Sequence, residues 1–248
     1  MNETLDHLSI GDLQLFQAKG GYRFSLDPVL LARFVRHKSV SRVFDLGTGN
    51  GILPLLLAKM TDARELVGIE LQESLAERAQ RNVEWNSLQE RVQIQLADIR
   101  VLKNIYPAAC ADLVVSNPPY RSADSGRAAP NEERAAARHE LFGGLNEFVS
   151  AAGWLLKNGG IFALVHLAER LPALIASMVA VNIEPKRLRM VHPRQGVAAR
   201  LILLEGRKGG RPGLDIEPPL IIYKNSGPAR EYTDEVMKMY DLDVLPAD

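Results

Sequence analysis

The sequence predicts an α/β fold in which a mainly parallel β-sheet is covered by helices on both faces. Short apolar segments of strand length alternate with longer segments of helical character, as expected of a parallel sheet with crossover helices. A glycine-rich turn joins one early strand directly to a helix, and several strands end on an acidic or amide residue. In sheets of this kind, ligands bind outside the carboxyl ends of the strands.

The expected elements follow one another in a regular order. Strands are expected over residues 41–46, 65–70, 91–97, 111–116 and 160–166. Helices are expected over residues 27–37, 51–60, 72–86, 144–157 and 167–181. Residues 186–191 and 199–205 are expected to close the sheet as an antiparallel pair. We interpret the chain as one globular domain with an N-terminal arm and first helix (1–40), a core (41–205) and a C-terminal extension (206–248).

Composition narrows the class of protein. The chain has 248 residues, 46% of them hydrophobic, which is enough for a full α/β core. No apolar run reaches the roughly 18 residues of a membrane span, and the N-terminus lacks a signal pattern. The single Cys110 cannot form an internal disulfide or a thiolate zinc site, so we expect a cytoplasmic protein without a metal. The formal net charge is zero, which still allows a local basic patch.

The glycine-rich turn follows a strand that ends near Asp45. Its glycines fall at Gly47, Gly49 and Gly51, and this spacing lets the backbone turn tightly and approach a ligand at the start of the next helix. The dinucleotide-binding fingerprint requires its third glycine three residues after the second, and Ile52 occupies that position. The turn therefore predicts a nucleotide-like cofactor and disfavours a nicotinamide dinucleotide.

Two further acids follow neighbouring strands. Glu70 ends the strand 65–70, about twenty residues beyond the glycine turn, where an acid accepts the ribose hydroxyls in this kind of fold. Asp98 follows the strand at 92–96. Taken alone, each acid is better explained as a surface residue at a strand end. Together with Asp45 and Asn117, however, they place polar groups at successive strand ends along one edge of the sheet.

The motif Asn117-Pro118-Pro119-Tyr120 follows the apolar strand 111–116. Its prolines remove two backbone donors and leave the carbonyls of Asn117 and Pro118 as acceptors. An exocyclic NH2 group has two donors, which an asparagine side-chain oxygen and a neighbouring carbonyl can accept while the ring stacks on Tyr120. The motif predicts chemistry on the amino group of a planar substrate. The alternative is a rigid turn without function.

Basic residues suggest contact with a polyanion in three places. In the N-terminal arm, Lys19 and Arg23 are interleaved with Phe16, Tyr22 and Phe24, a combination that suits a cofactor or a nucleobase.

In the same arm, Ser25 or Asp27 is expected to cap the helix that begins at Pro28.

The segment 121–141 is interpreted as a substrate-contacting loop, with Arg134, Arg138 and His139 near phosphate, or else as a solvated helix. The third place is the segment 186–211, whose only acid is Glu205 and whose basic residues are Lys186, Arg187, Arg189, Arg194, Arg200, Arg207, Lys208 and Arg211. Such clustering in a neutral chain predicts RNA contact. The alternative is a hairpin whose charges prevent edge pairing.

Several of these motifs together resemble one family of enzymes. The chain resembles the bacterial tRNA (adenine-N6)-methyltransferases that modify the adenine 3′ of the anticodon of valine tRNA. The resemblance rests on residues 17–27, 45–51, 70–72, 117–120, 137–140 and 219–223. It implies a Rossmann-like class I methyltransferase fold with a mainly parallel seven-stranded sheet, an antiparallel closing strand, S-adenosyl-L-methionine as cofactor and tRNA as partner.

The resemblance also implies roles for individual residues. In-line methyl transfer is expected at Asn117, Pro118, Pro119 and Tyr120. Cofactor contacts are expected from Phe24, Asp27, Asp45, Gly47, Thr48, Gly49, Gly51, Glu70, Leu71, Asp98, Ile99 and Asn117. RNA contacts are expected from Lys19, Arg23, Arg138, Arg187, Arg189, Arg194 and Arg200.

Two other functions remain open at this point. The Asn-Pro-Pro-Tyr turn is shared with the N5-glutamine methyltransferases of release factors, because a primary amide also offers two donors. A cofactor-dependent RNA-binding module without turnover is the third interpretation. The residues of 121–136 cannot be matched individually to the family.

Overall fold

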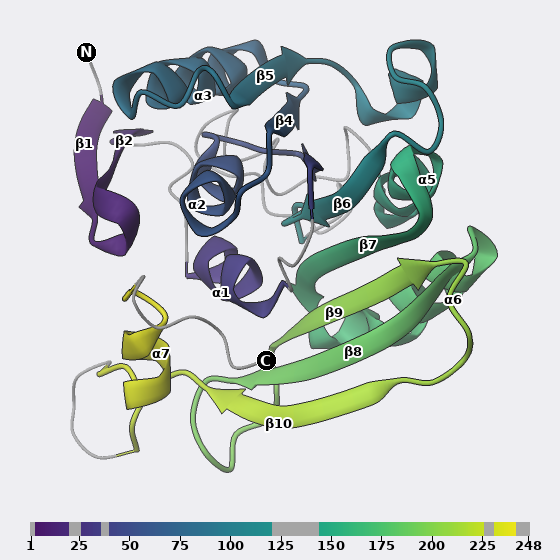
Figure 1. The fold of residues 1–248 in the computed structure, drawn as a ribbon. Coiled ribbons are helices and arrows are strands. Elements are labelled where there is room, and N and C mark those ends of the chain that lie inside the picture. The colour runs from purple at the N-terminus through teal and green to yellow at the C-terminus, as the bar shows by residue number, and fades with distance from the viewer. Residues whose placement is uncertain (1–2, 20–25, 36–39, 121–143, 226–230, 242–248) are drawn as a thin grey trace, which may run out of the picture.

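The structure is a computed structural model that describes residues 3–19, 26–35, 40–120, 144–225 and 231–241. A sheet of eight strands runs through these residues in the order β10-β8-β9-β7-β6-β3-β4-β5 (Figure 1). Its strands are β3 (Arg42–Leu46), β4 (Glu65–Glu70), β5 (Val92–Leu96), β6 (Ala111–Ser116), β7 (Leu156–Leu167), β8 (Ile183–His192), β9 (Leu201–Lys208) and β10 (Asp215–Ile221). Strands β5, β4, β3, β6 and β7 pair in parallel, and β9 pairs antiparallel with both β7 and β8. The predicted α/β class and the antiparallel closing pair are confirmed.

The sheet has one strand more than the seven that the sequence predicts. The additional strand, β10, pairs in parallel with β8, and its register shifts between Glu217 and Leu220. Pro218 and Pro219 lie at this irregularity. Proline cannot donate to a ladder and is confined to edge strands and bulges, and β10 is at the edge of the sheet. A pair of prolines therefore does not exclude a strand here.

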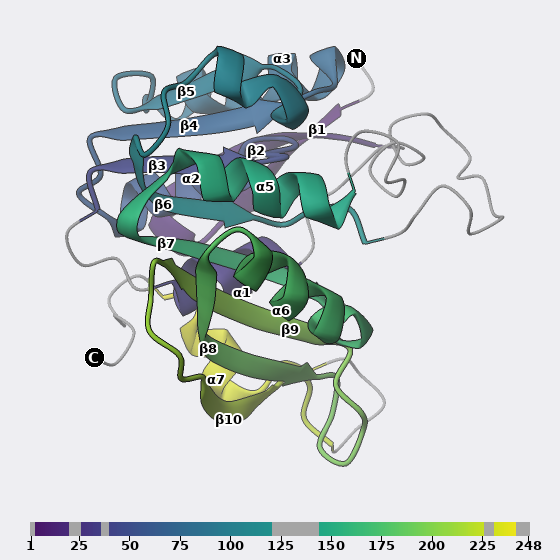
Figure 2. The same cartoon turned by 90° about the vertical axis from the view of Figure 1, so that its right-hand side faces the viewer.

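Helices cover both faces of the sheet (Figure 2). They are α1 (Asp27–Phe34), α2 (Ile52–Met60), α3 (Glu73–Trp85), α5 (Leu145–Leu155), α6 (Leu171–Ala180) and α7 (Asp234–Lys238), with short 3-10 helices η1 (Ile10–Asp12), η2 (Ile99–Asn104) and η4 (Ala168–Arg170). Each of the five helices expected from the sequence is present, with ends that differ by a few residues. Among the described residues, no helix is both long and apolar enough to cross a membrane.

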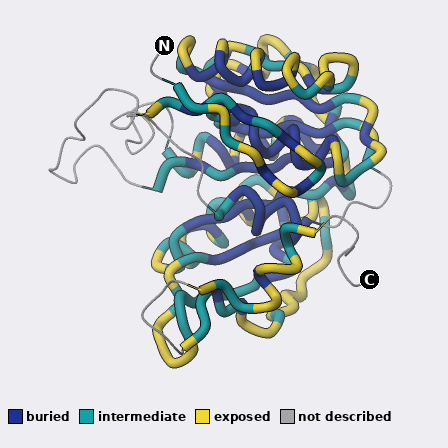
Figure 3. The backbone as a smooth tube through the Cα atoms, turned by 90° about the vertical axis from the view of Figure 1, so that its left-hand side faces the viewer, coloured by how far each residue is buried: buried dark blue, intermediate teal, exposed yellow. Residues whose placement is uncertain are grey.

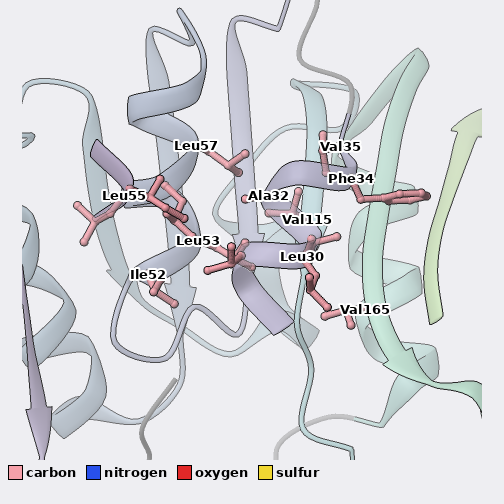
Figure 4. Packing of buried hydrophobic residues seen from close by; sticks show 14 of the residues in the cluster. Leu30, Ala32, Phe34, Val35, Ile52, Leu53, Leu55, Leu57, Val115 and Val165 are labelled. Carbon is pink, nitrogen blue, oxygen red and sulfur yellow. The ribbon is translucent and has the colours of Figure 1, made fainter. Parts of the chain in front are cut away.

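The core divides into two apolar clusters, one on each face of the sheet. Adjacent residues of β3 belong to different clusters, since Val43 packs with α1 and α2 whereas Phe44 packs with α5 and α6. This follows from the period of two along a strand, and a strand buried on both faces is accordingly apolar throughout. Figure 4 shows Leu30 of α1 beside Val165 of β7 in the first cluster. Burial is continuous along the central strands (Figure 3).

The first described residues form a hairpin that the sequence analysis does not predict. Strands β1 (Glu3–Leu8) and β2 (Leu13–Ala18) pair antiparallel and lie beside α3 (Figure 1). Two asparagines four residues apart, one in the last turn of α3 and one at its C-cap, bind the free edge of β2 through their side chains. The Phe16 amide donates to Asn82 Oδ1 (2.7 Å), and the Gln14 amide donates to Asn86 Oδ1 (3.0 Å). These side chains satisfy backbone groups that a third strand would otherwise bind.

The buried Asn82 also reaches the glycine-rich turn. Its side-chain nitrogen donates to the backbone oxygen of Asn50 (2.9 Å), and the residue is fully buried. One side chain thus bonds the hairpin on one side and the loop between β3 and α2 on the other.

The prediction that Arg187 contacts RNA is wrong, because its guanidinium lies inside the protein. The residue is 8% exposed. Its nitrogens donate to Glu205 (2.8 Å), to Glu217 (2.8 Å) and to the backbone oxygen of Phe34 (3.0 Å). These partners belong to β9, β10 and α1, so Arg187 joins the closing strands to a helix. A buried cation of this kind cannot reach a phosphate at the surface.

Replacing Arg187 with alanine is therefore expected to lower the free energy of unfolding by about 3–5 kcal/mol, because the buried Glu205 loses the charge of the Arg187 guanidinium. Urea unfolding followed by circular dichroism measures this loss. The control is the double variant Arg187→Met/Glu205→Leu, which removes both charges and should recover much of the stability. An alanine variant with an unchanged unfolding midpoint contradicts the structural role of Arg187.

Candidate active site

The candidate site lies at the carboxyl edge of the central strands. β3 lies between β4 and β6, and all three are parallel, so their carboxyl ends meet at one edge. Asp45 lies near the end of β3, Glu70 ends β4, and Asn117 directly follows β6. The sheet thus brings together three side chains that are spread over residues 45–117 of the sequence.

The glycine loop between β3 and α2 has a backbone shape that requires glycine. Gly47, Gly49 and Gly51 have φ angles of 73°, 59° and 83°, a region that other residues adopt at a steric cost. A Cβ at Gly51 would also lie 3.2 Å from the Cβ of Ala79 on α3. The amides of Gly47 and Thr48 donate to the backbone oxygen of Ile69 on β4 (3.0 and 2.9 Å). The loop is thereby held against the neighbouring strand.

Glu70 holds this loop from the end of β4. Its carboxylate accepts the amide of Gly49 (2.8 Å) through one oxygen and the amides of Leu71 and Gln72 (2.9 Å each) through the other. Glu70 is buried, and this burial raises its pKa in spite of the three amides. The carboxylate therefore fixes the glycine loop relative to the start of α3, with Leu71 half-buried beside it.

Asp45 is the most unusual charge in the site. It is 1% exposed, and among the described residues neither of its oxygens has a hydrogen-bond partner of ordinary geometry. The Thr48 hydroxyl and the side-chain amide atoms of Asn50 are also buried without partners in that part of the chain. Burial, opposed in part by the neighbouring Thr48 hydroxyl, and then the charge of Glu70 raise the pKa of Asp45 to about 7.

Unpaired buried polar groups cost free energy, and their presence in a folded protein calls for an explanation. Asp45, Thr48 and Asn50 all border the glycine loop. A polar ligand that brings its own donors to this loop provides that explanation.

Asp98 follows β5 and binds its own neighbour. Its carboxylate accepts the Arg100 amide (2.8 Å) and pairs with the Arg100 guanidinium, and these contacts lower the pKa of Asp98. It caps the 3-10 helix η2, in which Ile99 is buried. Asp98 lies at the same edge as Asp45 and Glu70, because β5 is parallel to β4.

The Asn-Pro-Pro-Tyr turn meets the first residue of α1. The Tyr120 hydroxyl lies 2.8 Å from Asp27 Oδ2 and 2.8 Å from Asn117 Oδ1. The prediction that Asp27 caps α1 is wrong, because the N-cap is Leu26 and makes no side-chain capping bond. The alternative cap, Ser25, lies outside the described residues. The Asp27 side chain instead reaches across to the turn after β6.

His166 belongs to the same group of side chains, although the sequence analysis gives it no role. Its ring lies edge-on to Tyr120, with centroids 5.4 Å apart. Its Nδ1 accepts the Leu167 amide (2.8 Å). Burial, and then the charge of Arg170, lowers its pKa to about 4, so the imidazole is neutral at physiological pH. The sequence does carry a sign of this position, because His166 lies near the end of an apolar strand, as Asp45 and Glu70 do.

The other predicted RNA-contacting residues lie at the closing strands and the hairpin or outside the described residues. Arg200 lies at the carboxyl end of β7, where its backbone oxygen accepts the Ala168 amide (3.0 Å). Arg189 pairs with Glu235 and donates to the backbone oxygen of Pro218 (3.0 Å). Arg194 donates to the backbone oxygen of Lys224 and lies over Tyr223. Arg200 is exposed, and so is Lys19, which directly follows β2 at the end of the hairpin. Outside the described residues are Arg23, Phe24, Arg134, Arg138 and His139.

Comparisons with known proteins support one family. The family described as methyltransferase small domain matches residues 27–176. The chain is 30% identical over 219 residues to the tRNA1(Val) (adenine(37)-N6)-methyltransferase of Haemophilus influenzae (strain PittGG), covering 88% of this chain and 89% of the relative. It is 30% identical over 189 residues to the enzyme of the same name from Tolumonas auensis, covering 76% and 77%.

Solved structures support the same fold. A predicted O-methyltransferase from Agrobacterium tumefaciens matches with a TM-score of 0.70 at 22% identity, covering 87% of this chain and 96% of that chain. A tRNA m1G37 methyltransferase from M. jannaschii matches with a TM-score of 0.58 at 15% identity, covering 85% and 56%.

The buried Asp45 predicts a specific pH dependence of stability. Its pKa of about 7 in the folded chain lies above its usual value of 3.8. Between those two pH values the folded state holds a proton that the unfolded state releases, so stability falls as pH rises and the full penalty is present above pH 7. Asp45→Asn is therefore expected to stabilise the ligand-free protein above pH 7 by on the order of 3 kcal/mol.

Urea unfolding of the wild type and of Asp45→Asn from pH 4 to pH 8 measures this difference. The exposed acid Asp62 provides the control variant Asp62→Asn, whose stability should follow that of the wild type. If the stabilities of the wild type and Asp45→Asn change in parallel with pH, the burial penalty on Asp45 is contradicted.

Proposed function

Because the chain belongs to the methyltransferase small domain family, we propose that it transfers a methyl group from S-adenosylmethionine to the N6 amino group of an adenine in tRNA. The observation that carries the proposal is the Asn-Pro-Pro-Tyr turn, which leaves β6 beside the glycine loop of β3. The relatives named tRNA1(Val) (adenine(37)-N6)-methyltransferase match most of this chain, which supports both the transferred group and the class of substrate.

The residues around the glycine loop fit the proposed cofactor. S-adenosylmethionine carries an ammonium group, a ribose diol and an adenine amine, which are all hydrogen-bond donors. Asp45, Thr48 and Asn50 offer buried polar atoms without partners in the described chain, and a cationic donor would favour the ionised form of Asp45. In the proposed complex, Glu70 accepts ribose hydroxyls in addition to its backbone amides, and Asp98 accepts the adenine amine in addition to its bonds with Arg100. When bound, the cofactor supplies the methyl group from its sulfonium.

The turn after β6 would position the substrate nitrogen. The side-chain oxygen of Asn117 and the backbone carbonyl of Pro118 accept the two hydrogens of the adenine N6 group, which directs the nitrogen lone pair away from the ring. Tyr120 provides an aromatic surface for the base. Positioning of this kind accounts for roughly 7–11 kcal/mol of a barrier in well-aligned reactions. No strong base is required, which agrees with a neutral His166 beside Tyr120.

An adenine in an anticodon loop suits this site on physical grounds. A base must leave the helical stack to reach the Asn-Pro-Pro-Tyr turn at the edge of this sheet, and this costs least where the nucleic acid is already single-stranded. A primary amide of a protein glutamine would satisfy the same two acceptors. The substrate must therefore be identified by experiment.

The protein is expected to methylate adenine in tRNA when it is incubated with total tRNA and labelled S-adenosylmethionine. Mass spectrometry of the digested nucleosides should then find the label in N6-methyladenosine. Label found only in an added release factor would favour the glutamine amide instead. Label in a methylated guanine, or in no product at any enzyme concentration, contradicts the proposal.

Asn117→Ala is expected to leave the affinity for S-adenosylmethionine nearly unchanged, because other residues carry most of the proposed cofactor contacts. The rate of methyl transfer should fall by roughly 10²–10³-fold, since one of the two acceptors that orient the amine is lost. Isothermal titration calorimetry and single-turnover assays measure the two effects separately. Asn104→Ala is the same substitution at an exposed asparagine and serves as the control. Near-normal turnover of Asn117→Ala would sink the assignment.

A further inference from the structure

The hydroxyl of Tyr120 lies between two oxygen atoms, each of which needs a hydrogen-bond donor. Asp27 Oδ2 and Asn117 Oδ1 are each 2.8 Å from it, and both atoms are acceptors. A phenol has a single proton, so Tyr120 can donate to only one of them. In the other contact, the Tyr120 oxygen must accept a hydrogen bond that Asp27 or Asn117 donates.

The relative strength of the two possible hydrogen bonds determines which residue accepts the Tyr120 proton. Its proton goes to the carboxylate of Asp27, since a hydrogen bond to an ionised acceptor is about twice as strong as one between neutral groups. The two ends of a primary amide have the same shape, so the Asn117 side chain satisfies the second contact with its NH2 group directed at the Tyr120 oxygen. Its carbonyl oxygen then faces the opposite side.

The two prolines explain why Asn117 needs such a partner. An asparagine in a turn commonly fixes its side-chain oxygen on a backbone N–H two residues later. Here that residue is Pro119, and Pro118 precedes it, so neither position has an N–H to offer. Local backbone groups therefore do not set the direction of the Asn117 amide, and the chain from Asp27 through Tyr120 does.

We propose that Asp27 is a positioning residue that acts through the Tyr120 hydroxyl to orient the Asn117 amide, so that its oxygen faces the substrate amine. This inference rests on the proposed function. If the amide is reversed, the Asn117 NH2 group faces the substrate amine, and the hydrogen that Asn117 would have accepted is left without an acceptor, a loss expected of an unpaired donor. His166 lies edge-on to the Tyr120 ring and limits the positions that the hydroxyl can take.

The proposal predicts a non-additive mutant cycle. Asp27→Ala and Tyr120→Phe each break the hydrogen-bond relay from Asp27 through the Tyr120 hydroxyl to Asn117, and Tyr120→Phe keeps the aromatic ring. Each variant is expected to slow single-turnover methyl transfer by roughly 10–100-fold. With S-adenosylmethionine saturating for each variant, the double variant should be no slower than Tyr120→Phe, because the proposed relay runs from Asp27 through the hydroxyl. Asp27→Asn keeps an acceptor without the charge and should give an intermediate rate. Asp62→Ala, at an exposed acid, is the control.

Nuclear magnetic resonance provides a readout that does not depend on activity. The side-chain NH2 signals of Asn117, assigned by their loss in Asn117→Asp, should shift in both Asp27→Ala and Tyr120→Phe but not in Asp62→Ala. Multiplicative losses in the double variant, or unshifted NH2 signals in either single variant, overturn the relay. A wild-type protein that makes no N6-methyladenosine refutes the proposed function instead, and the amide signals still test the hydrogen bonds.

Discussion

The candidate site depends on the parallel pairing of β4, β3 and β6. Parallel strands end at the same edge, so side chains that follow three separate strands become neighbours without any loop having to carry them there. The same pairing buries these strands on both faces, and their apolar side chains leave the edge as the place where polar groups can gather. The polar side chains at this edge of the three strands are those of Asp45, Glu70 and Asn117. Ser116, at the end of β6, is also polar, but it is buried and its hydroxyl donates to the backbone oxygen of Leu46 on β3.

Burial raises the pKa of both central acids at this edge, but the two carboxylates differ in their hydrogen-bond partners. Glu70 is buried, but three backbone amides surround its carboxylate. Asp45 is buried to a similar extent without such partners in the described chain. One acid therefore organises the glycine loop, whereas the other keeps its hydrogen-bonding capacity for a ligand. Stability is reduced at Asp45, as is common where a folded chain prepares a binding site.

The sequence predicted much of this arrangement, for reasons that are local. Apolar runs, glycine spacing and polar residues at strand ends act within a few positions, and they were sufficient for the central strands, the five helices and the polar groups at the edge. Contacts between distant segments were not visible. Arg187 read as a surface cation because Glu205 is 18 positions away, and Asp27 read as a helix cap because Tyr120 is 93 positions away. The strand β10 was missed because its prolines are permitted only by its place at the edge.

The bonds of Asn82 have a consequence for motion. One buried amide links the backbone of the N-terminal hairpin to that of the glycine loop, so the hairpin cannot detach without exposing or orphaning the polar atoms that the loop also uses. Local opening of the two segments is thereby coupled, and they form a single cooperative unit of the fold. The first residues of the chain thus share in the rigidity of the loop at the far end of β3.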